Sequence, residues 1–125
     1  IKSSLDFLMK NSVSGNLIFI ISDFLTEGYA VSAAILAQHN DFFTIRVFDR
    51  IEKQFPKLGW VQMMDFESRR KQWMNTSKGD FDAQYRHKSE LDLEYYNKFL
   101  SKYAIRNMSI STDEDVQKKM ATLMN

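Results

Sequence analysis

The sequence predicts an α/β fold of the Rossmann-like type, in which an open parallel sheet is accompanied by an inserted β-hairpin. Two apolar runs, residues 17–22 and 42–48, each predict a strand, and Asp23 and Asp49 follow them directly. A helical pattern at residues 30–37 joins the runs, and two strands connected by a helix lie parallel with a right-handed crossover. A length of 125 residues suits one domain, so we expect a single α/β domain over the whole chain.

The first half of the chain supplies two helices and two strands. A short helix is predicted around residues 5–9, and a turn-forming stretch that contains Gly15 follows it. The run LIFIIS at residues 17–22 is continuous and partly β-branched, so we expect an interior strand that is covered on both faces. The helix at residues 30–37 is rich in alanine, which suits close packing. The second strand, residues 42–48, completes the β-α-β pattern.

The second half predicts a hairpin, a third strand and two helices. Residues 60–66 and 70–76 predict a β-hairpin inserted after the second strand. A long amphipathic helix is expected over residues 80–103, because apolar residues recur there at helical spacing. These residues are Phe81, Tyr85, Leu91, Tyr95, Phe99 and Tyr103. Residues 107–111 predict a third strand, and residues 113–124 a closing helix with acidic residues in its first turn. Three side chains of that helix are expected to face inward: Val116, Met120 and Leu123.

Composition excludes several classes of protein. Seventeen basic residues against sixteen acidic ones leave a net charge of +1, so no overall field directs the chain to nucleic acid. The lack of cysteine excludes a disulfide scaffold and a thiolate zinc site, and it fits the cytoplasm, where we expect the protein. The longest apolar run is far shorter than the roughly 20 residues of a membrane span. Because the chain starts at Ile1 and enters a helical pattern at once, we expect a fragment of a longer protein, which could carry a membrane anchor elsewhere.

Four short motifs occur in an order and at a spacing that cover the chain from Asn16 to Asn125. They are ISDF at 21–24, RVFDRIEKQFP at 46–56, GWVQMMDFES at 59–68 and ISTDED at 110–115. In these motifs the sequence resembles the carboxyl-terminal half of the bacterial family called domain of unknown function 58 (DUF58). The resemblance implies part of a von Willebrand factor A-like fold and an association with MoxR-type AAA+ ATPases. We therefore expect a module for protein–protein contacts and not an enzyme.

Ser22 and Asp23 are the metal-site candidates that the resemblance implies. The metal-ion-dependent adhesion site of von Willebrand A-like domains joins an Asp-x-Ser-x-Ser motif and a loop threonine to an aspartate after a later strand, and Asp23 matches that aspartate. No Asp-x-Ser-x-Ser occurs in this chain. Because Mg²⁺ takes about six oxygen ligands, we expect it only in the full-length protein and no cofactor in this fragment. The simpler interpretation of Asp23 is an aspartate that accepts hydrogen bonds from the backbone of the next loop.

Carboxylates at the strand ends suggest a second class of function. Asp23, Asp49 and residues 112–113 are predicted to lie on one edge of the sheet, where open α/β folds bind ligands. The alternative is therefore a Rossmann-like hydrolase or phosphotransferase that uses Asp23 and Asp49. Asp49 with Glu52 could act as an acid–base pair.

Partner binding has four candidate residues: Trp60, Trp73, Asp49 and Glu52. Most aromatic residues fall at core spacing, whereas the two tryptophans lie in the predicted hairpin and would bind a partner well if exposed. The simpler interpretation of the two acids is packing of the loop, with an ion pair to Arg46 or Arg50. An exposed sheet edge also predicts a homo-oligomer, because its backbone groups are free to pair with a second copy.

Overall fold

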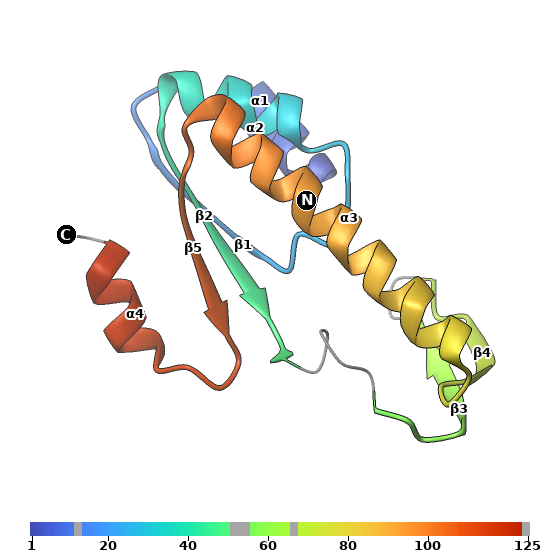
Figure 1. The fold of residues 1–125 in the computed structure, drawn as a ribbon. Coiled ribbons are helices and arrows are strands. Elements are labelled where there is room, and N and C mark those ends of the chain that lie inside the picture. The colour runs from blue at the N-terminus through green and yellow to red at the C-terminus, as the bar shows by residue number, and fades with distance from the viewer. Residues whose placement is uncertain (12–13, 51–55, 66–67, 124–125) are drawn as a thin grey trace.

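The computed structural model describes residues 1–11, 14–50, 56–65 and 68–123. Its helices and strands follow one another as α1 (Lys2–Asn11), β1 (Leu17–Ser22), α2 (Ala30–His39), β2 (Asp41–Phe48), β3 (Trp60–Met64), β4 (Lys71–Asn75), α3 (Gly79–Tyr103), β5 (Arg106–Ser111) and α4 (Val116–Leu123) (Figure 1). Each predicted helix and strand is present, with small shifts of its ends.

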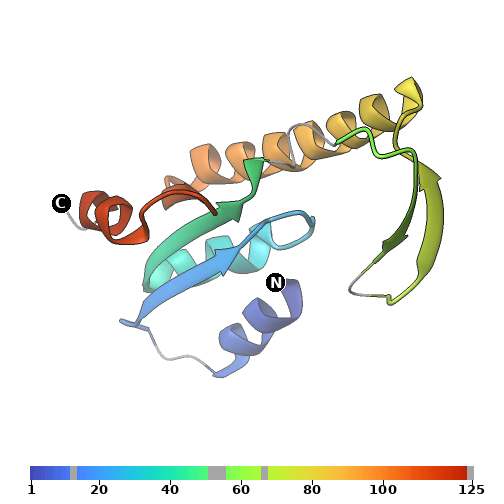
Figure 2. The same ribbon diagram turned by 90° about the horizontal axis from the view of Figure 1, so that it is seen from below.

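The strands form two separate sheets. β1, β2 and β5 make a three-stranded sheet in the order β1-β2-β5, and both pairs are parallel. β3 and β4 pair antiparallel as a hairpin between β2 and α3 in the chain. Figure 2 shows this hairpin beside the first turns of α3 and set apart from the parallel sheet. The predicted open α/β architecture with an inserted hairpin is confirmed.

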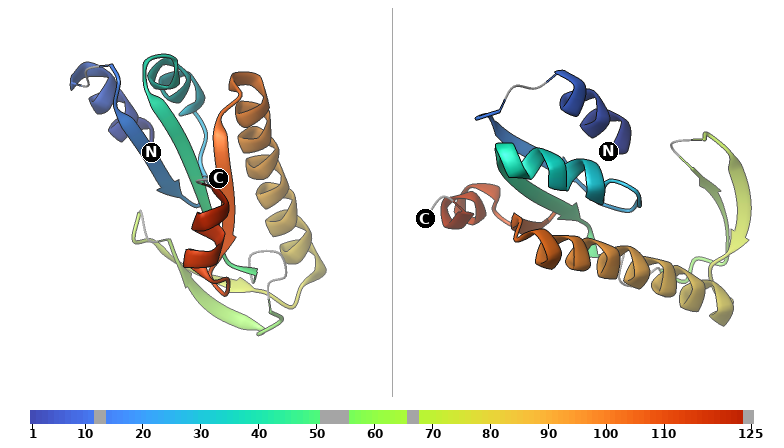
Figure 3. Two further views of the ribbon diagram at one scale, coloured as in Figure 1. Left: turned by 90° about the vertical axis from the view of Figure 1, so that its left-hand side faces the viewer. Right: turned by 90° about the horizontal axis from the view of Figure 1, so that it is seen from above.

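Helices cover the two faces of the parallel sheet unequally. α1, α2 and α3 lie on one face, and α4 lies on the other face, against β5 (Figure 3). The larger core lies between the parallel sheet and the three helices α1, α2 and α3. Its buried residues are Leu5, Ile18, Phe24, Tyr29, Ala33, Leu36, Phe42, Tyr96, Phe99 and Ile105. The smaller core lies on the α4 side: Ile45, Met108 and Ile110, with Val47 and Met120 packed against them. None of the helices in the described part of the chain is long and apolar enough to cross a membrane.

β1 is an edge strand with one face open to solvent. Leu17 and Ile21 are 59% and 65% exposed and Phe19 is also exposed, whereas Ile18 is buried. The prediction of an interior strand covered on both faces is therefore wrong. β1 pairs only with β2 among the described strands, and α4 packs against β5, two strands away. The continuous apolar run thus has the alternating burial of a strand with one covered face.

α3 turns most of the predicted stripe of residues inward, and Leu91 is the exception. Tyr95 and Phe99 pack against the larger core as expected. Leu91, however, is 47% exposed, and the neighbouring position Asp92 is buried together with Tyr96. Successive residues of a helix are about 100° apart, so a change of one position moves a side chain off the buried face. The prediction for Leu91 is wrong because the spacing of the aromatic residues predicts that the segment is a helix but not which neighbouring positions are buried.

α4 begins later than predicted because Asp115 acts as its N-cap. The Oδ1 atom of Asp115 accepts hydrogen bonds from the backbone N–H groups of residues 117 and 118, at 3.0 and 3.2 Å. Val116 is exposed, so its predicted inward orientation is wrong, whereas Met120 packs against the smaller core as predicted. The side chain of Leu123 lies outside the described residues.

Candidate functional site

Asp23 forms a tight turn at the carboxyl end of β1. Its Oδ1 atom accepts hydrogen bonds from the backbone N–H of Leu25 at 3.2 Å and from the Ser22 hydroxyl at 3.3 Å. The Ser22 Oγ atom in turn accepts a hydrogen bond from the Phe24 N–H at 3.2 Å. Side-chain bonds of this kind stabilise turns that follow strands. They agree with the interpretation of Asp23 as an aspartate that holds the backbone of the next loop.

The turn directs the following residues into the core. Phe24 has a φ of 57°, which is rare for an aromatic residue, and its ring centroid lies 4.5 Å from that of Tyr96 and 5.4 Å from that of Tyr29. Further along, the Gly28 N–H donates a hydrogen bond of 3.1 Å to the Tyr95 hydroxyl. The loop after β1 is therefore fastened to α3 at two places.

The residues present do not by themselves fit a magnesium site. Ser22 and Asp23 lie together, but the described part of the chain contains no group of three or more histidine, aspartate or glutamate side chains that could hold a metal ion. Two neighbouring oxygen donors fall short of the about six ligands that Mg²⁺ requires. The metal site therefore stays a prediction for a longer protein.

Asp49 meets the segment after β5 at the same edge of the sheet. The Thr112 hydroxyl donates a hydrogen bond of 3.0 Å to Asp49 Oδ2, and Arg50 Nε lies 3.1 Å from Asp113 Oδ2. Because the three strands are parallel, Asp23 also lies at this edge. The predicted gathering of these strand-end residues at one edge is confirmed. Arg50 thus forms its ion pair with Asp113.

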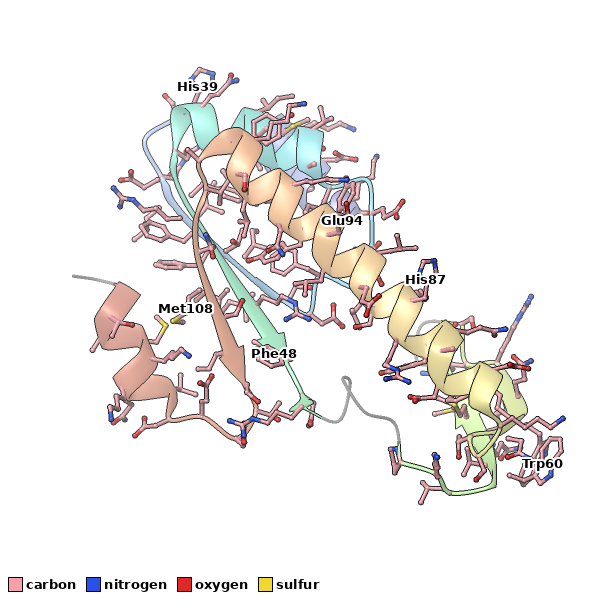
Figure 4. All side chains as sticks on the ribbon, in the orientation of Figure 1. His39, Phe48, Trp60, His87, Glu94 and Met108 are labelled. Atoms are coloured by element: carbon pink, nitrogen blue, oxygen red, sulfur yellow. The ribbon has the colours of Figure 1, made fainter. Side chains whose placement is uncertain are left out.

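A pocket of about 290 Å³ opens between the carboxyl end of β2 and one side of α3. It is lined by Arg46, Phe48, Asp49, Arg86, Ser89, Glu90 and Leu93. Figure 4 shows Phe48 at the end of β2. The hydrolase or phosphotransferase alternative needs Asp23 and Asp49 in one pocket, and Asp23 is not among the described residues that line this one. Glu52, the other member of the predicted acid–base pair, lies outside the described residues.

Arg46 is a site residue for which we made no functional prediction. It is only 9% exposed, and its guanidinium carbon lies 4.9 Å from the centroid of the Phe48 ring. No described residue forms a hydrogen bond or an ion pair with its guanidinium group, so the pairing suggested with Asp49 is absent. The sequence signal for this residue is a charge inside the mostly apolar run FFTIRVF, because arginine side chains are seldom this deeply buried.

Trp60 and Trp73 lie on the same face of the hairpin. Trp60 pairs with Asn75 and Trp73 pairs with Gln62, so the two indoles are diagonal neighbours, and the side chain of Met64 alternates onto the same face. Trp60 and Trp73 are 65% and 63% exposed, and Met64 is exposed as well. Figure 4 shows Trp60 on the side of the hairpin away from the parallel sheet. We call Trp60, Trp73 and Met64 the tryptophan face.

Comparison with known proteins supports the resemblance noted above. The family described as protein of unknown function DUF58 matches residues 1–93, which is well over half of the chain. The match includes the motifs at 21–24, 46–56 and 59–68, and it begins upstream of Asn16, where we expected the likeness to start. The motif at 110–115 lies outside it. No curated protein and no solved structure gives a match to the chain. The chain belongs to the DUF58 family.

Proposed function

We propose that this chain is a protein-interaction module whose partner docks on the tryptophan face. The observation that supports this is the exposure of two indoles on one face of a hairpin that stands apart from the parallel sheet. A two-stranded hairpin is marginally stable in water, and neighbouring exposed aromatic side chains mark interaction surfaces. Tryptophan is also among the residues most enriched where binding energy concentrates.

Basic residues border the tryptophan face. Arg69 and Arg70 are exposed just before β4, and Lys71 pairs with Met64 in the hairpin register, which places it on the same side as the indoles. Complementary charge speeds association and selects partners more than it adds affinity. We therefore expect the partner to present an apolar groove with an acidic rim.

The resemblance to proteins encoded beside MoxR-type AAA+ ATPases supports such an ATPase as the partner. It also supports a von Willebrand factor A-like fold as the architecture to which the parallel sheet belongs. In this proposal Mg²⁺ assists binding only in the full-length protein, where other ligands would join Ser22 and Asp23.

Fluorescence gives a direct test, because both tryptophans of the chain lie on the proposed docking surface. Titration with a MoxR-type ATPase from the same genome is expected to shift tryptophan emission to shorter wavelength as the indoles leave water. Trp60→Ala and Trp73→Ala are each expected to weaken binding by at least tenfold, the loss typical of central interface aromatics. Phe7→Ala is the matched control, since Phe7 is an equally exposed aromatic residue on α1. Unchanged affinity in both tryptophan variants would refute the proposal.

Metal assistance is tested separately in the full-length protein. Partner affinity is measured with and without Mg²⁺, for the unaltered protein and for Asp23→Ala. The proposal expects tighter binding with Mg²⁺ and loss of that increase in the variant. Identical affinities under all four conditions would remove the metal from the proposal and leave the tryptophan face untouched.

A further inference from the structure

We propose that the pocket between β2 and α3 binds a carboxylate that is carried on a small apolar group, and that Arg46 holds the carboxylate. This site is separate from the tryptophan face, which lies on the hairpin. It is formed by the central strand of the parallel sheet and by one side of the long helix.

Arg46 is the first reason for this proposal. The side chain of Arg46 is mostly buried, but none of its guanidinium nitrogens is a buried atom without a partner among the described residues, so these nitrogens are accessible from the pocket. They carry five N–H donors in a planar fork. Arg46 is nine-tenths buried, and the Phe48 ring at 4.9 Å faces the guanidinium without accepting its N–H groups. Since no described residue accepts a hydrogen bond from this group, its donors remain available to a ligand in the pocket that Arg46 lines.

The shape of the pocket is the second reason. Arg86, Ser89, Glu90 and Leu93 follow the i, i+3, i+4, i+7 spacing of one helix face, so α3 presents a single wall to the pocket. Its volume of about 290 Å³ is at the lower end of the range for small-molecule sites, and Leu93 contributes apolar surface. The pocket also lies at the carboxyl end of β2, the position where open α/β sheets bind ligands.

Charge on the walls favours a carboxylate over a phosphate. Asp49 and Glu90 both line the pocket, so a doubly charged phosphate would meet two like charges. Arg86 is already paired with Asp82, with 2.7 Å between Arg86 Nη2 and Asp82 Oδ2. One guanidinium group is thus left for the ligand, and its planar fork matches the two oxygens of a carboxylate.

The experiment is a titration of the ¹⁵N-labelled chain with small probes, followed by NMR chemical shifts. Benzoate is expected to bind with an affinity on the order of millimolar, as suits a small fragment, and to shift the amide signals of residues 46–49 and 86–93. Benzamide, which has the same shape without the charge, is expected to bind at least about tenfold more weakly. N-acetylphenylalanine is the second carboxylate probe. If it binds more tightly than benzoate, the carboxylate comes from the end of a peptide chain, and if it binds more weakly, from a free small molecule. Both results support the proposal.

Two variants test whether benzoate binding depends on Arg46 in particular and not on any arginine that lies over an aromatic ring. Arg46→Gln is expected to weaken benzoate binding at least about tenfold, because it removes the charged donors. Arg106→Gln is the matched control, since Arg106 also lies over a ring, 5.2 Å from that of Phe43, but is exposed and outside the pocket. If Arg46→Gln does not fold, the comparison of benzoate with benzamide on the unaltered chain still decides. Equal binding of those two probes, tighter binding of inorganic phosphate, or shifts confined to the hairpin would overturn the proposal.

Discussion

Replacing Tyr29 with phenylalanine is expected to stabilise the protein, although Tyr29 is completely buried. Its side chain is 0% exposed, and its hydroxyl oxygen has no hydrogen-bond partner among the described residues. The ring itself is well packed, with centroids of Phe24, Tyr95 and Phe99 at 5.4, 5.3 and 5.5 Å. Burial raises the pKa of the Tyr29 hydroxyl well above its usual value, so the group stays neutral at any ordinary pH. Tyr29→Phe removes the hydroxyl and keeps these ring contacts.

The size of the effect follows from the burial of that hydroxyl. A buried polar group without a partner costs about 1–3 kcal/mol of folding free energy. The small void that the lost oxygen leaves offsets part of the gain. We therefore expect Tyr29→Phe to raise the free energy of unfolding by about 1 kcal/mol, which corresponds to roughly 4 °C in Tm for a chain of this size.

Tyr96→Phe is the matched control, because the same chemical change should have the opposite sign there. The Tyr96 hydroxyl lies 2.9 Å from Thr44 Oγ1, and both residues are buried. Removing this hydroxyl leaves the Thr44 hydroxyl without its partner, at a cost of about 1–2 kcal/mol. Urea denaturation followed by circular dichroism measures both variants. An equal loss of stability in the two would refute the reasoning, since it would mean that the Tyr29 hydroxyl is bonded after all.

Three further predictions concern stability. Leu5→Ala is expected to cost about 2–5 kcal/mol in urea denaturation, because Leu5 is the buried side chain through which α1 enters the larger core, and a loss below 1 kcal/mol would contradict that role. Asp23→Ala is expected to cost about 1 kcal/mol while Asp23→Asn costs little, since the amide oxygen can still accept the Leu25 N–H; equal losses would show that the charge itself matters. The pKa of Glu114 lies below its ordinary value of 4.5, first because the Ser111 N–H donates to its carboxylate, so its stabilisation is complete above pH 4.5 and is lost as the pH falls through the lowered pKa. Glu114→Gln should therefore flatten the acid side of the stability profile, and an unchanged acid unfolding curve would contradict this.

Local patterns were sufficient for the order of helices and strands. β2 is a short, mostly apolar segment, β5 alternates polar residues with Met108 and Ile110, and α3 has aromatic side chains at helical spacing, so each is recognisable alone. The position of β1 at the edge was not predictable in this way. An apolar run can have the same sequence whether one face of the strand or both are buried. Which faces are buried depends on where α4 packs, and that packing is a contact between segments far apart in the chain.

In the candidate site, too, the features that depend on neighbouring residues were predictable and those that depend on tertiary packing were not. The turn at Asp23 was foreseen because it involves neighbouring residues, and the meeting of Asp49 with Thr112 followed from parallel strands that end at one edge. The pocket at Arg46 depends on the rotation of α3 about its axis. That rotation is set by tertiary packing, which also buries Asp92 and exposes Leu91 against expectation.

The open side of β1 has a practical consequence for work with this chain in solution. The strand contains neither a charge nor a proline, and its outer backbone edge is unpaired within the described part of the chain, so it resembles the segments that recruit further strands in aggregation. The homo-oligomer that we predict through this edge would form in competition with such uncontrolled growth. Ile21→Lys is the substitution expected to reduce such growth, because the Ile21 side chain is 65% exposed and the change leaves the buried Ile18 undisturbed, whereas the Phe19 ring stacks on that of the buried Phe43.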